Sequence, residues 1–323
     1  MANTVHWSFR EAPSGPHVVS IGTFDGVHHG HRYLLSLAAA RATQLELPLL
    51  IVTFEPNPAQ IIRPDRFRGR LNTPRQKLDH LWASGAGQVV VVPFTDERRQ
   101  ESPENFVADL VAAANPVEVW VGEDFALGHN RSGNVARLSE IGARAGFSIH
   151  AVPRREHDGQ IVSSSRIREH ILAGEPELAH TLLGYPYRIS GEVIYGAQVG
   201  RTIGFPTANV EPPPLLVPLP DGIYASLATL GETNRPKWAM TYIGTRPALN
   251  TGARQIETNI FDFSQDIYGQ TLHCDFVQRL RPDANFESVE ALIAQLERDE
   301  LATREVLARH TLQDDDPRKA ADT

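Results

Sequence analysis

The chain has 323 residues, of which 41% are hydrophobic and 22% are charged, with a formal net charge of −8. This length predicts two domains, and this composition excludes wholesale disorder. The acidic balance argues against a nucleic-acid coat or a basic membrane binder, and no apolar run approaches the roughly 20 residues of a membrane span. Cys274 is the only cysteine, and the N-terminus lacks the basic start and apolar core of a signal peptide. We therefore expect a cytoplasmic protein that binds neither nucleic acid nor membrane.

Lysine is scarce and excludes one large class of nucleotide sites. It occurs only at Lys77, Lys237 and Lys319, and none of these lies in a G-x-x-x-x-G-K-[ST] loop. Phosphate chemistry in this chain therefore needs donors other than a P-loop lysine.

The first part of the chain alternates strand-like and helix-like segments. The strand candidates are short, β-branched and almost continuously apolar, as buried parallel strands are; they are residues 17–23, 49–54, 88–93, 117–121 and 147–152. Helical patterns lie between them at 31–45, 74–83, 103–114 and 135–145. This alternation predicts an α/β domain with a doubly wound parallel sheet. Such a sheet binds ligands beyond the carboxyl ends of its strands, where strand order reverses.

The pattern changes near residue 184. A helical stretch over 165–183 ends at Gly184, and Tyr185-Pro186-Tyr187 follows as a stiff connector. Short strand-like segments come next, at 188–195, 222–228, 238–242, 255–263 and 271–280. They predict a small antiparallel barrel or sandwich, followed by a helix over 288–307. We place the domains at 1–183 and 184–310 and expect the acidic tail 311–323 to be disordered.

The first predicted strand runs directly into the string Gly22-Thr23-Phe24-Asp25-Gly26-Val27-His28-His29-Gly30-His31. His28 and His31 are three residues apart at the start of a helix, so they share one face. Gly30 lacks a side chain where a ligand would approach, and a helix N-terminus offers free N–H groups with partial positive charge. A histidine pair alone more often indicates a cap or a solvated face. The glycines, the strand and the topology favour a phosphate site.

This H-x-G-H pattern resembles the nucleotidylyltransferase superfamily, and the longer string resembles the N-terminal module of bacterial bifunctional riboflavin kinase/FAD synthetases (FMN adenylyltransferases). Further matching pieces follow in the family's order at residues 53–58, 71–74 with Lys77, 105–106, 121–125 and 163–165 with Arg168. The resemblance covers residues 17–183. It implies transfer of AMP from ATP to FMN, which yields FAD and releases pyrophosphate.

The resemblance also implies roles for single residues. It assigns the nucleotide and its phosphates to Gly22, His28, Gly30, His31, Asp124, Ser163, Ser164 and Arg168, of which the two histidines and Arg168 are the catalytic candidates. Phe24, Phe54 and Pro56 either form the apolar walls of a flavin slot or pack at strand ends. Leu127 departs from the family, which usually has phenylalanine there.

Two further expectations for this module do not depend on the family. The phosphate of FMN is already largely ionised at neutral pH, with a second pKa of about 6, so no general base is needed. Six basic residues in the segment 63–77 either form a solvated loop or steer anions.

The second motif is a glycine-rich string that ends in Pro206-Thr207-Ala208-Asn209. Glycine-rich loops can wrap a phosphate with backbone N–H groups, and threonine hydroxyl and asparagine carbonyl oxygens are hard ligands suited to Mg²⁺. The string at 200–209 resembles the signature of riboflavin kinase, and residues 242–247, 257–263 and 292–301 match the same family. The resemblance covers residues 185–307 and implies phosphorylation of riboflavin by ATP to FMN.

In that resemblance the ATP loop consists of Gly196, Gly200, Arg201 and Gly204. Thr207 and Asn209 would hold Mg²⁺ and the phosphates of ATP. The ribityl hydroxyl of riboflavin must lose a proton when it attacks, and Glu257 matches the family's catalytic glutamate. A glutamate in a strand, taken alone, more often faces solvent.

The sequence thus predicts a bifunctional enzyme that uses Mg²⁺ and takes ATP as co-substrate in both steps. Three alternatives stay open: a monofunctional flavin enzyme with one decayed site, an adenylyltransferase acting on a non-flavin phosphate, and a flavin-binding regulatory module. The oligomeric state cannot be predicted from the sequence.

Overall fold

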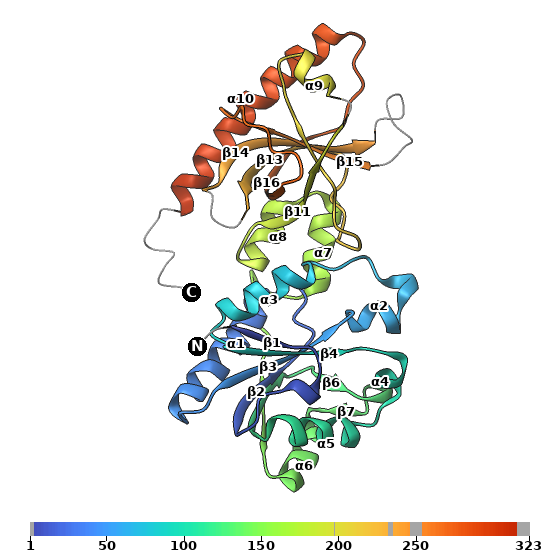
Figure 1. The fold of residues 1–323 in the computed structure, drawn as a ribbon, viewed down its shortest axis with the longest axis vertical. Helices are drawn as coiled ribbons and strands as arrows, with labels where there is room; N and C mark the ends of the chain where they lie inside the picture. The colour runs from blue at the N-terminus through green and yellow to red at the C-terminus, as the bar shows by residue number, and fades with distance from the viewer. Residues whose placement is uncertain (1–2, 197, 232–234, 246–253, 315–323) are drawn as a thin grey trace. The chain divides into compact units, whose positions relative to one another are not determined.

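The structure is a computed structural model that describes residues 3–196, 198–231, 235–245 and 254–314 (Figure 1). Contacts within the chain divide it into two compact units, Met1–Ser164 and Ser165–Thr323. The stretch predicted as one helix over 165–183 is two helices, α7 (Ser164–Ala173) and α8 (Pro176–Leu183). The interruption falls at Gly174, whose φ of 78° lies in the left-handed region that glycine tolerates best. By contacts, almost all of α7 and the whole of α8 belong to the second unit.

The first unit contains a parallel sheet of six strands in the order β1-β4-β3-β2-β5-β8. Their bounds are β1 (Thr4–His6), β2 (His17–Ile21), β3 (Leu49–Glu55), β4 (Gln88–Pro93), β5 (Pro116–Gly122) and β8 (Ser148–Val152). The five predicted strands are confirmed, and β1 is an additional strand that pairs with β4. Strand order reverses between β2 and β5, because β2 lies beside β3 on one side and β5 on the other. A ligand site is therefore expected at the carboxyl end of β2.

The four predicted helices of this unit are present as α1 (His29–Gln44), α3 (Pro74–Ala83), α5 (Pro103–Ala114) and α6 (Val135–Ala145). Thr73 and Gln76 form a capping box at the start of α3, and the Ser102 hydroxyl accepts from Asn105 N–H at the start of α5. The remaining segments are short: η1 (Phe9–Glu11), α2 (Pro58–Ile62), η2 (Pro64–Arg66), α4 (Asp96–Gln100), η3 (His129–Arg131), and the hairpins β6–β7 (Ala126–Leu127, Gly133–Asn134) and β9–β10 (Glu156–His157, Gln160–Ile161).

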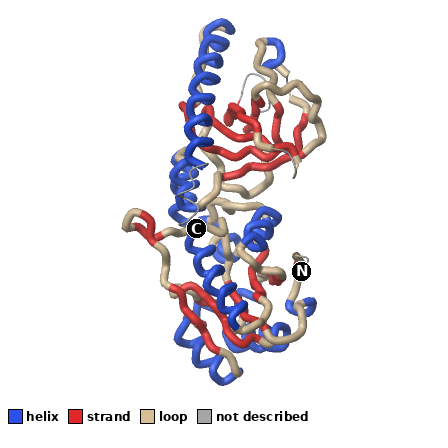
Figure 2. Tube along the Cα trace, turned by 90° about the vertical axis from the view of Figure 1, so that its left-hand side faces the viewer, coloured by secondary structure: helices blue, strands red, loops and turns tan. Residues whose placement is uncertain are grey.

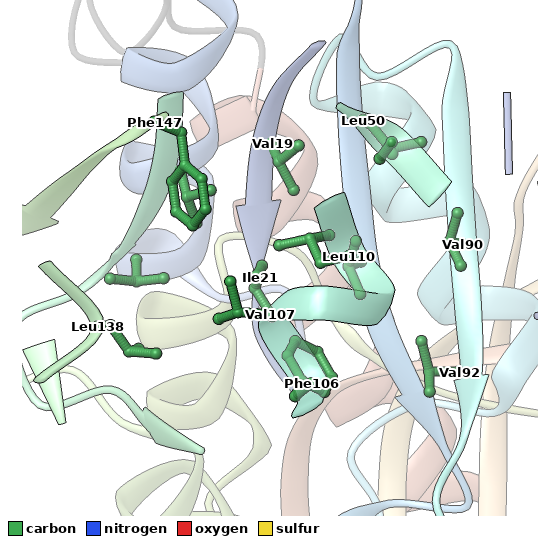
Figure 3. Packing of buried hydrophobic residues seen from close by; sticks show 14 of the residues in the cluster. Val19, Ile21, Leu50, Val90, Val92, Phe106, Val107, Leu110, Leu138 and Phe147 are labelled. Atoms are coloured by element: carbon green, nitrogen blue, oxygen red, sulfur yellow. The ribbon is translucent and has the colours of Figure 1, made fainter. Parts of the chain in front are cut away.

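The sheet is covered on both faces, as a doubly wound fold requires. One hydrophobic cluster joins β2, β3 and β4 to α5 and α6; Figure 3 shows Val19, Ile21, Leu50, Val90 and Val92 around Phe106, Val107, Leu110, Leu138 and Phe147. A second cluster on the other face joins the same strands to α1 and α3. Their burial supplies most of the free energy that holds the sheet and helices together.

The second unit is a closed antiparallel barrel, which decides between the predicted barrel and sandwich. Its strands run in the order β11-β12-β15-β14-β13-β16. Their bounds are β11 (Tyr187–Ile194), β12 (Ala208–Val210), β13 (Gly222–Leu230), β14 (Lys237–Thr245), β15 (Arg254–Ile260) and β16 (Thr271–Pro282). Strand β12 comes from the segment that the sequence placed in a loop, and α9 (Val199–Thr202) precedes it.

Helix α10 (Val289–Asp314) lies along the barrel, where Figure 2 shows it as the long helix beside the strands. It contacts β13, β14 and β16. The helix extends past its predicted end at residue 307, so the first four residues of the predicted tail are helical, and 315–323 lie outside the described residues. No helix in the described part of the chain is long and apolar enough to cross a membrane.

A chain of small polar side chains crosses the barrel interior. Ser226 Oγ lies 2.7 Å from Thr241 Oγ1, which lies 3.0 Å from Thr258 Oγ1, which in turn lies 3.3 Å from Cys274 Sγ. All four side chains are fully buried. Burial raises the pKa of the Cys274 thiol to about 12, so this cysteine is a structural and unreactive group. These hydrogen bonds link β13, β14, β15 and β16.

Candidate active sites

The first candidate site lies at the carboxyl end of β2, where the loop 22–28 leads into α1. His28 is the N-cap of α1, and its Nδ1 accepts the His31 backbone N–H at 3.4 Å. Since Nδ1 accepts, the neutral ring carries its proton on Nε2. The cap interpretation and the phosphate interpretation are therefore compatible, because one ring nitrogen caps the helix and the other can donate to a ligand.

The two predicted histidines are in direct contact. The His28 and His31 rings stack with their centroids 3.7 Å apart, and the Phe24 ring meets His31 edge-on at 5.3 Å. Burial lowers the pKa of His31 to about 3 and holds the pKa of His28 well below its ordinary value. Both rings are thus neutral at neutral pH. Among the described residues, nothing hydrogen-bonds to His31 Nδ1, although it is buried.

Two glycines of the loop make room for its own side chains. A Cβ at Gly22 would lie 2.9 Å from the Phe24 ring, and a Cβ at Gly30 would lie 3.2 Å from the His28 ring. Gly30 was predicted to clear space for a ligand. In the structure the nearest side chain is His28, so Gly30 first serves to place that ring.

Asp25 fixes the loop to two other segments, a role that the sequence analysis missed. Its buried Oδ1 accepts the Leu71 N–H at 2.9 Å, and its backbone carbonyl accepts the Ser164 hydroxyl at 2.8 Å. These bonds bring Ser163 and Ser164 to the histidine loop. An aspartate among the glycine and apolar residues of the string 22–31 could have indicated a structural role. Its partner Leu71 is 46 residues away, so the sequence does not identify it.

The remaining polar candidates of this site lie in different surroundings. Asp124 is exposed two residues beyond β5, at the carboxyl edge of the sheet, with Arg154 Nη1 at 3.7 Å from its Oδ2. Arg168 lies on α7 within the second unit, so its role at the histidine loop stays a prediction.

The predicted flavin walls are mostly core residues. Phe24 is 1% exposed in the cluster with α1, and Phe54 is 7% exposed and packs near Phe94 and Phe106. This packing agrees with the interpretation that these phenylalanines pack at strand ends. Pro56 is half-buried directly after β3, and Leu127, the departure from the family pattern, lies in the short strand β6.

The basic segment 63–77 divides into two groups. Arg63, Arg66, Arg68 and Arg75 are exposed. Arg70 and Lys77 are buried instead, where the Arg70 guanidinium pairs with Glu55 at 2.8 Å and Lys77 Nζ donates to the Phe54 carbonyl at 2.9 Å. Burial lowers the pKa of Lys77. These two cations hold the end of β3 and are not part of a solvated loop.

The second candidate site joins β12 to β15. Asn209 stands opposite Glu257 in the antiparallel register, and the Thr207 hydroxyl donates to Glu257 Oε2 at 3.4 Å. Glu257 is only 7% exposed, so it does not face solvent. The structure thus brings together the predicted base and both predicted metal ligands.

The glycine-rich loop is shaped by close contacts. A Cβ at Gly196 would clash with the Asn209 amide, and the Gly200 carbonyl accepts the Phe205 N–H at 2.8 Å. Gly204 has a φ of 86°, which favours glycine. Asn259, which the sequence analysis did not assign, donates to the Pro206 carbonyl at 2.6 Å and holds the Pro-Thr-Ala-Asn segment against β15.

A cavity of about 370 Å³ opens beside these residues. Arg201 and Thr207 are among its polar lining residues. The rest of its wall combines apolar side chains, among them Val193, Ile260, Phe263, Ile267 and Tyr268, with Thr258, Ser264, Gln265 and Asp266. A cavity with an apolar wall and a few polar groups is typical of a small-molecule site. Arg246 and Pro247, which end the matched string 242–247, lie outside the described residues.

The donor set of this site suits a hard cation. The Thr207 hydroxyl and the Asn209 amide oxygen are ligands of the kind that Mg²⁺ accepts together with water and phosphate oxygens. No group of three or more His, Cys, Asp or Glu side chains that could hold a metal occurs in the part of the chain that the structure describes.

Two family models match the chain, one in each half. The model described as FAD synthetase matches residues 11–166, and the model described as riboflavin kinase matches residues 183–307. Curated relatives named bifunctional riboflavin kinase/FMN adenylyltransferase include one from Escherichia coli K12, 36% identical over 92% of this chain and 95% of the relative. A relative from Listeria monocytogenes with the same name is 36% identical over 90% and 93%. A crystal structure described as a macrolide-efflux protein from Streptococcus pneumoniae covers 94% of this chain and 99% of its own, with a TM-score of 0.85 and 28% identity.

A parallel-sheet unit with a histidine loop at its strand reversal, followed by a closed barrel with a glycine-rich loop, defines a two-module nucleotide-dependent transferase. The chain belongs to the bifunctional riboflavin kinase/FMN adenylyltransferase family. The family matches also place a boundary between residues 166 and 183, whereas contacts divide the chain after Ser164. Our domain limits at 183 and 184 stay a prediction.

Proposed function

We propose that the second unit of this bifunctional enzyme phosphorylates riboflavin at the Thr207–Asn209–Glu257 site and that the first unit adenylates FMN at the His28–His31 loop. The family supports both activities with ATP as co-substrate. The observation that carries the residue assignment is the convergence of Thr207 and Asn209 on a buried Glu257 from a neighbouring strand.

In the kinase step the ribityl hydroxyl oxygen attacks the γ-phosphorus of ATP, and ADP leaves. Glu257 would accept the hydroxyl proton, which a neutral alcohol must lose during the attack. Thr207 and Asn209 would hold Mg²⁺, which supplies positive charge to the phosphates when bound. Backbone N–H groups of the glycine-rich string and the Arg201 guanidinium would cradle the phosphates.

In the adenylyl step a phosphate oxygen of FMN attacks the α-phosphorus of ATP, and the bond to the leaving pyrophosphate breaks. The nucleophile is already ionised, so no base is required. The Nε2–H of His28 would donate to a phosphate, and neutral His31 would do so with whichever nitrogen carries its proton. Magnesium is proposed here as the ion that accompanies the nucleotide.

The proposal is tested by incubating the protein with riboflavin, ATP and Mg²⁺ and separating the flavins by chromatography. We expect FMN first and then FAD. His28→Ala should stop at FMN, and Glu257→Gln should make FAD only when FMN is supplied. Two exposed residues provide matched controls, His129→Ala for the first unit and Glu192→Gln for the second, and both should behave as wild type.

Three results would contradict parts of this proposal. Absence of both products in wild type would refute the activities. If only one product formed, the monofunctional alternative would be favoured. If either substitution abolished both steps in a folded protein, the assignment of two separate sites would be wrong.

A further inference from the structure

The neutral histidines leave the negative charge of the triphosphate to other groups, such as Mg²⁺ and the predicted Arg168. Because burial lowers the pKa of both rings, His28 and His31 can donate hydrogen bonds but add no positive charge at neutral pH. A nucleoside triphosphate and its departing pyrophosphate carry several negative charges, which a transferase site stabilises with cations. Fixed positive charge around the start of α1 would therefore stabilise the bound triphosphate.

Four basic side chains gather there, and we call them the cationic rim: His29 and Arg32 on α1, and Arg155 and His157 on the hairpin segment 153–162. Arg32 Nη2 lies 3.3 Å from His29 Nδ1. Burial, followed by the charges of Arg32, His157 and Arg155, lowers the pKa of His29, as expected for groups close enough to repel one another. The two arginines are therefore the permanent charges of the rim.

The hairpin is fixed beside the histidine loop. The Val162 N–H donates to the Arg155 carbonyl at 2.9 Å, which closes the β9–β10 hairpin at its base. The Val162 carbonyl lies 3.9 Å from the position of a Cβ on Gly30. Two residues later, Ser164 donates to the Asp25 carbonyl. Arg155 thus belongs to a short, hydrogen-bonded segment that binds the histidine loop at Asp25 and passes close to Gly30.

The Arg155 guanidinium is available to an anion. It lies 4.6 Å from the centroid of the Tyr33 ring, one turn along α1 from His29. Within the described ranges it has no carboxylate partner, and the residue is exposed. The hairpin carries two acids, Glu156 and Asp158, and Asp158 lies 3.4 Å from His157. The Tyr33 ring holds the arginine by a cation–π contact without using its N–H donors.

We propose that Arg32 and Arg155 bind the β- and γ-phosphates of ATP at the adenylyltransferase site and hold the pyrophosphate until it leaves. The proposal rests on the proposed function of the first unit. Arginine suits this role because its planar guanidinium binds two phosphate oxygens at once and keeps its charge at any physiological pH. The rim thereby supplies the charge that a P-loop lysine supplies in other nucleotide sites.

The test uses the full-length Arg155→Gln and Arg32→Gln proteins, with Arg144→Gln as a matched control on the exposed surface of α6. Adenylation of supplied FMN gives the KM for ATP, and titration calorimetry with inorganic pyrophosphate gives its affinity directly. We expect each rim variant to raise the KM for ATP and to weaken pyrophosphate binding about tenfold. The KM for FMN and the riboflavin kinase step should not change, and Arg155→Lys should recover part of the loss.

Unchanged pyrophosphate affinity and an unchanged KM for ATP in both glutamine variants would overturn the proposal. The calorimetric arm separates it from the proposed function, because it needs no turnover. If wild type bound pyrophosphate but made no FAD, the proposed adenylyltransferase activity would be refuted. The role of the cationic rim would then be decided by the pyrophosphate affinities of the variants alone. If Arg155→Gln does not fold, Arg155→Lys is compared with Arg144→Gln in the same two measurements. Equal KM for ATP and equal pyrophosphate affinity in these two proteins would then overturn the proposal.

Discussion

Replacing His31 by phenylalanine should make the first unit less sensitive to acid. Burial lowers the pKa of His31 to about 3 in the folded protein, whereas an unfolded histidine titrates near 6.5. Protons therefore bind the unfolded chain more readily. The contribution of this ring to stability is fully present above about pH 6.5 and is lost as the pH falls toward 3. Phenylalanine keeps a ring in contact with Phe24 and His28 but does not titrate.

The size of the effect follows from the two pKa values. At pH 5 the unfolded ring is almost fully protonated and the folded ring is not, which lowers the unfolding free energy by about 2 kcal/mol relative to pH 7. This figure depends on the unfolded pKa and hardly on how far below 5 the folded value lies. The His31 side chain is half-buried although its Nδ1 has no exposed surface. Solvent at the exposed edge reduces the loss, so we expect about 1–2 kcal/mol.

Hydrogen exchange followed by mass spectrometry measures this loss within one unit of the full chain. Peptides from β2 and α1 report on the histidine loop, and peptides from β13 in the barrel serve as an internal control. After correction for the intrinsic exchange rate at each pH, the wild type should lose more protection between pH 7 and pH 5 than His31→Phe. Equal losses in the two proteins would show that His31 carries its proton in the folded state, and the neutral-histidine argument would be wrong.

Three further predictions concern the two activities. Gly196→Ala places a methyl group against the Asn209 amide, so phosphorylation of riboflavin should fall at least about tenfold while adenylation of supplied FMN is unchanged; equal loss of both would point to misfolding of the whole chain. Asp25→Ala leaves the buried Leu71 N–H without its acceptor and should cost about 1–3 kcal/mol of stability in the first unit, measured by urea unfolding, with loss of adenylation only. The pH profile of FMN adenylation should have an acid limb near pH 6 that belongs to the FMN phosphate, and a phosphonate analogue with a higher second pKa should move that limb upward; a limb that does not move would assign it to the enzyme.

The sequence predicted elements best where local signals mark their ends. Helices α3 and α5 begin and end at the predicted residues because Thr73 and Ser102 cap them and a proline follows each cap. Strands β1 and β12 were missed because three residues carry too little periodicity to be distinguished from a loop. The stretch 165–183 has a helical pattern throughout, and a single glycine at 174 decides where it breaks.

The candidate sites were also predicted only in part. Motifs of adjacent residues could be found in the sequence, whereas contacts between residues far apart in the sequence could not. The strings around His28 and Glu257 could be found because their residues are adjacent in sequence. Their surroundings could not: Asp25 binds Leu71, and Arg155 reaches Tyr33 from more than a hundred residues away. The protonation state of His31 also depends on burial, which no local pattern reveals.

The two sites differ in the way that their nucleophiles require. Each contains a buried carboxylate, and the two carboxylates have different partners. Asp25 in the first unit is held by the Leu71 N–H and serves to fix the loop, which suits a site whose phosphate nucleophile is already ionised. Glu257 in the second unit accepts from the Thr207 hydroxyl, and Thr207 lines the cavity, so we propose Glu257 as the base that an alcohol nucleophile needs. Burial alone therefore does not identify a catalytic acid in this chain, because the buried carboxylate of Asp25 already has a structural role.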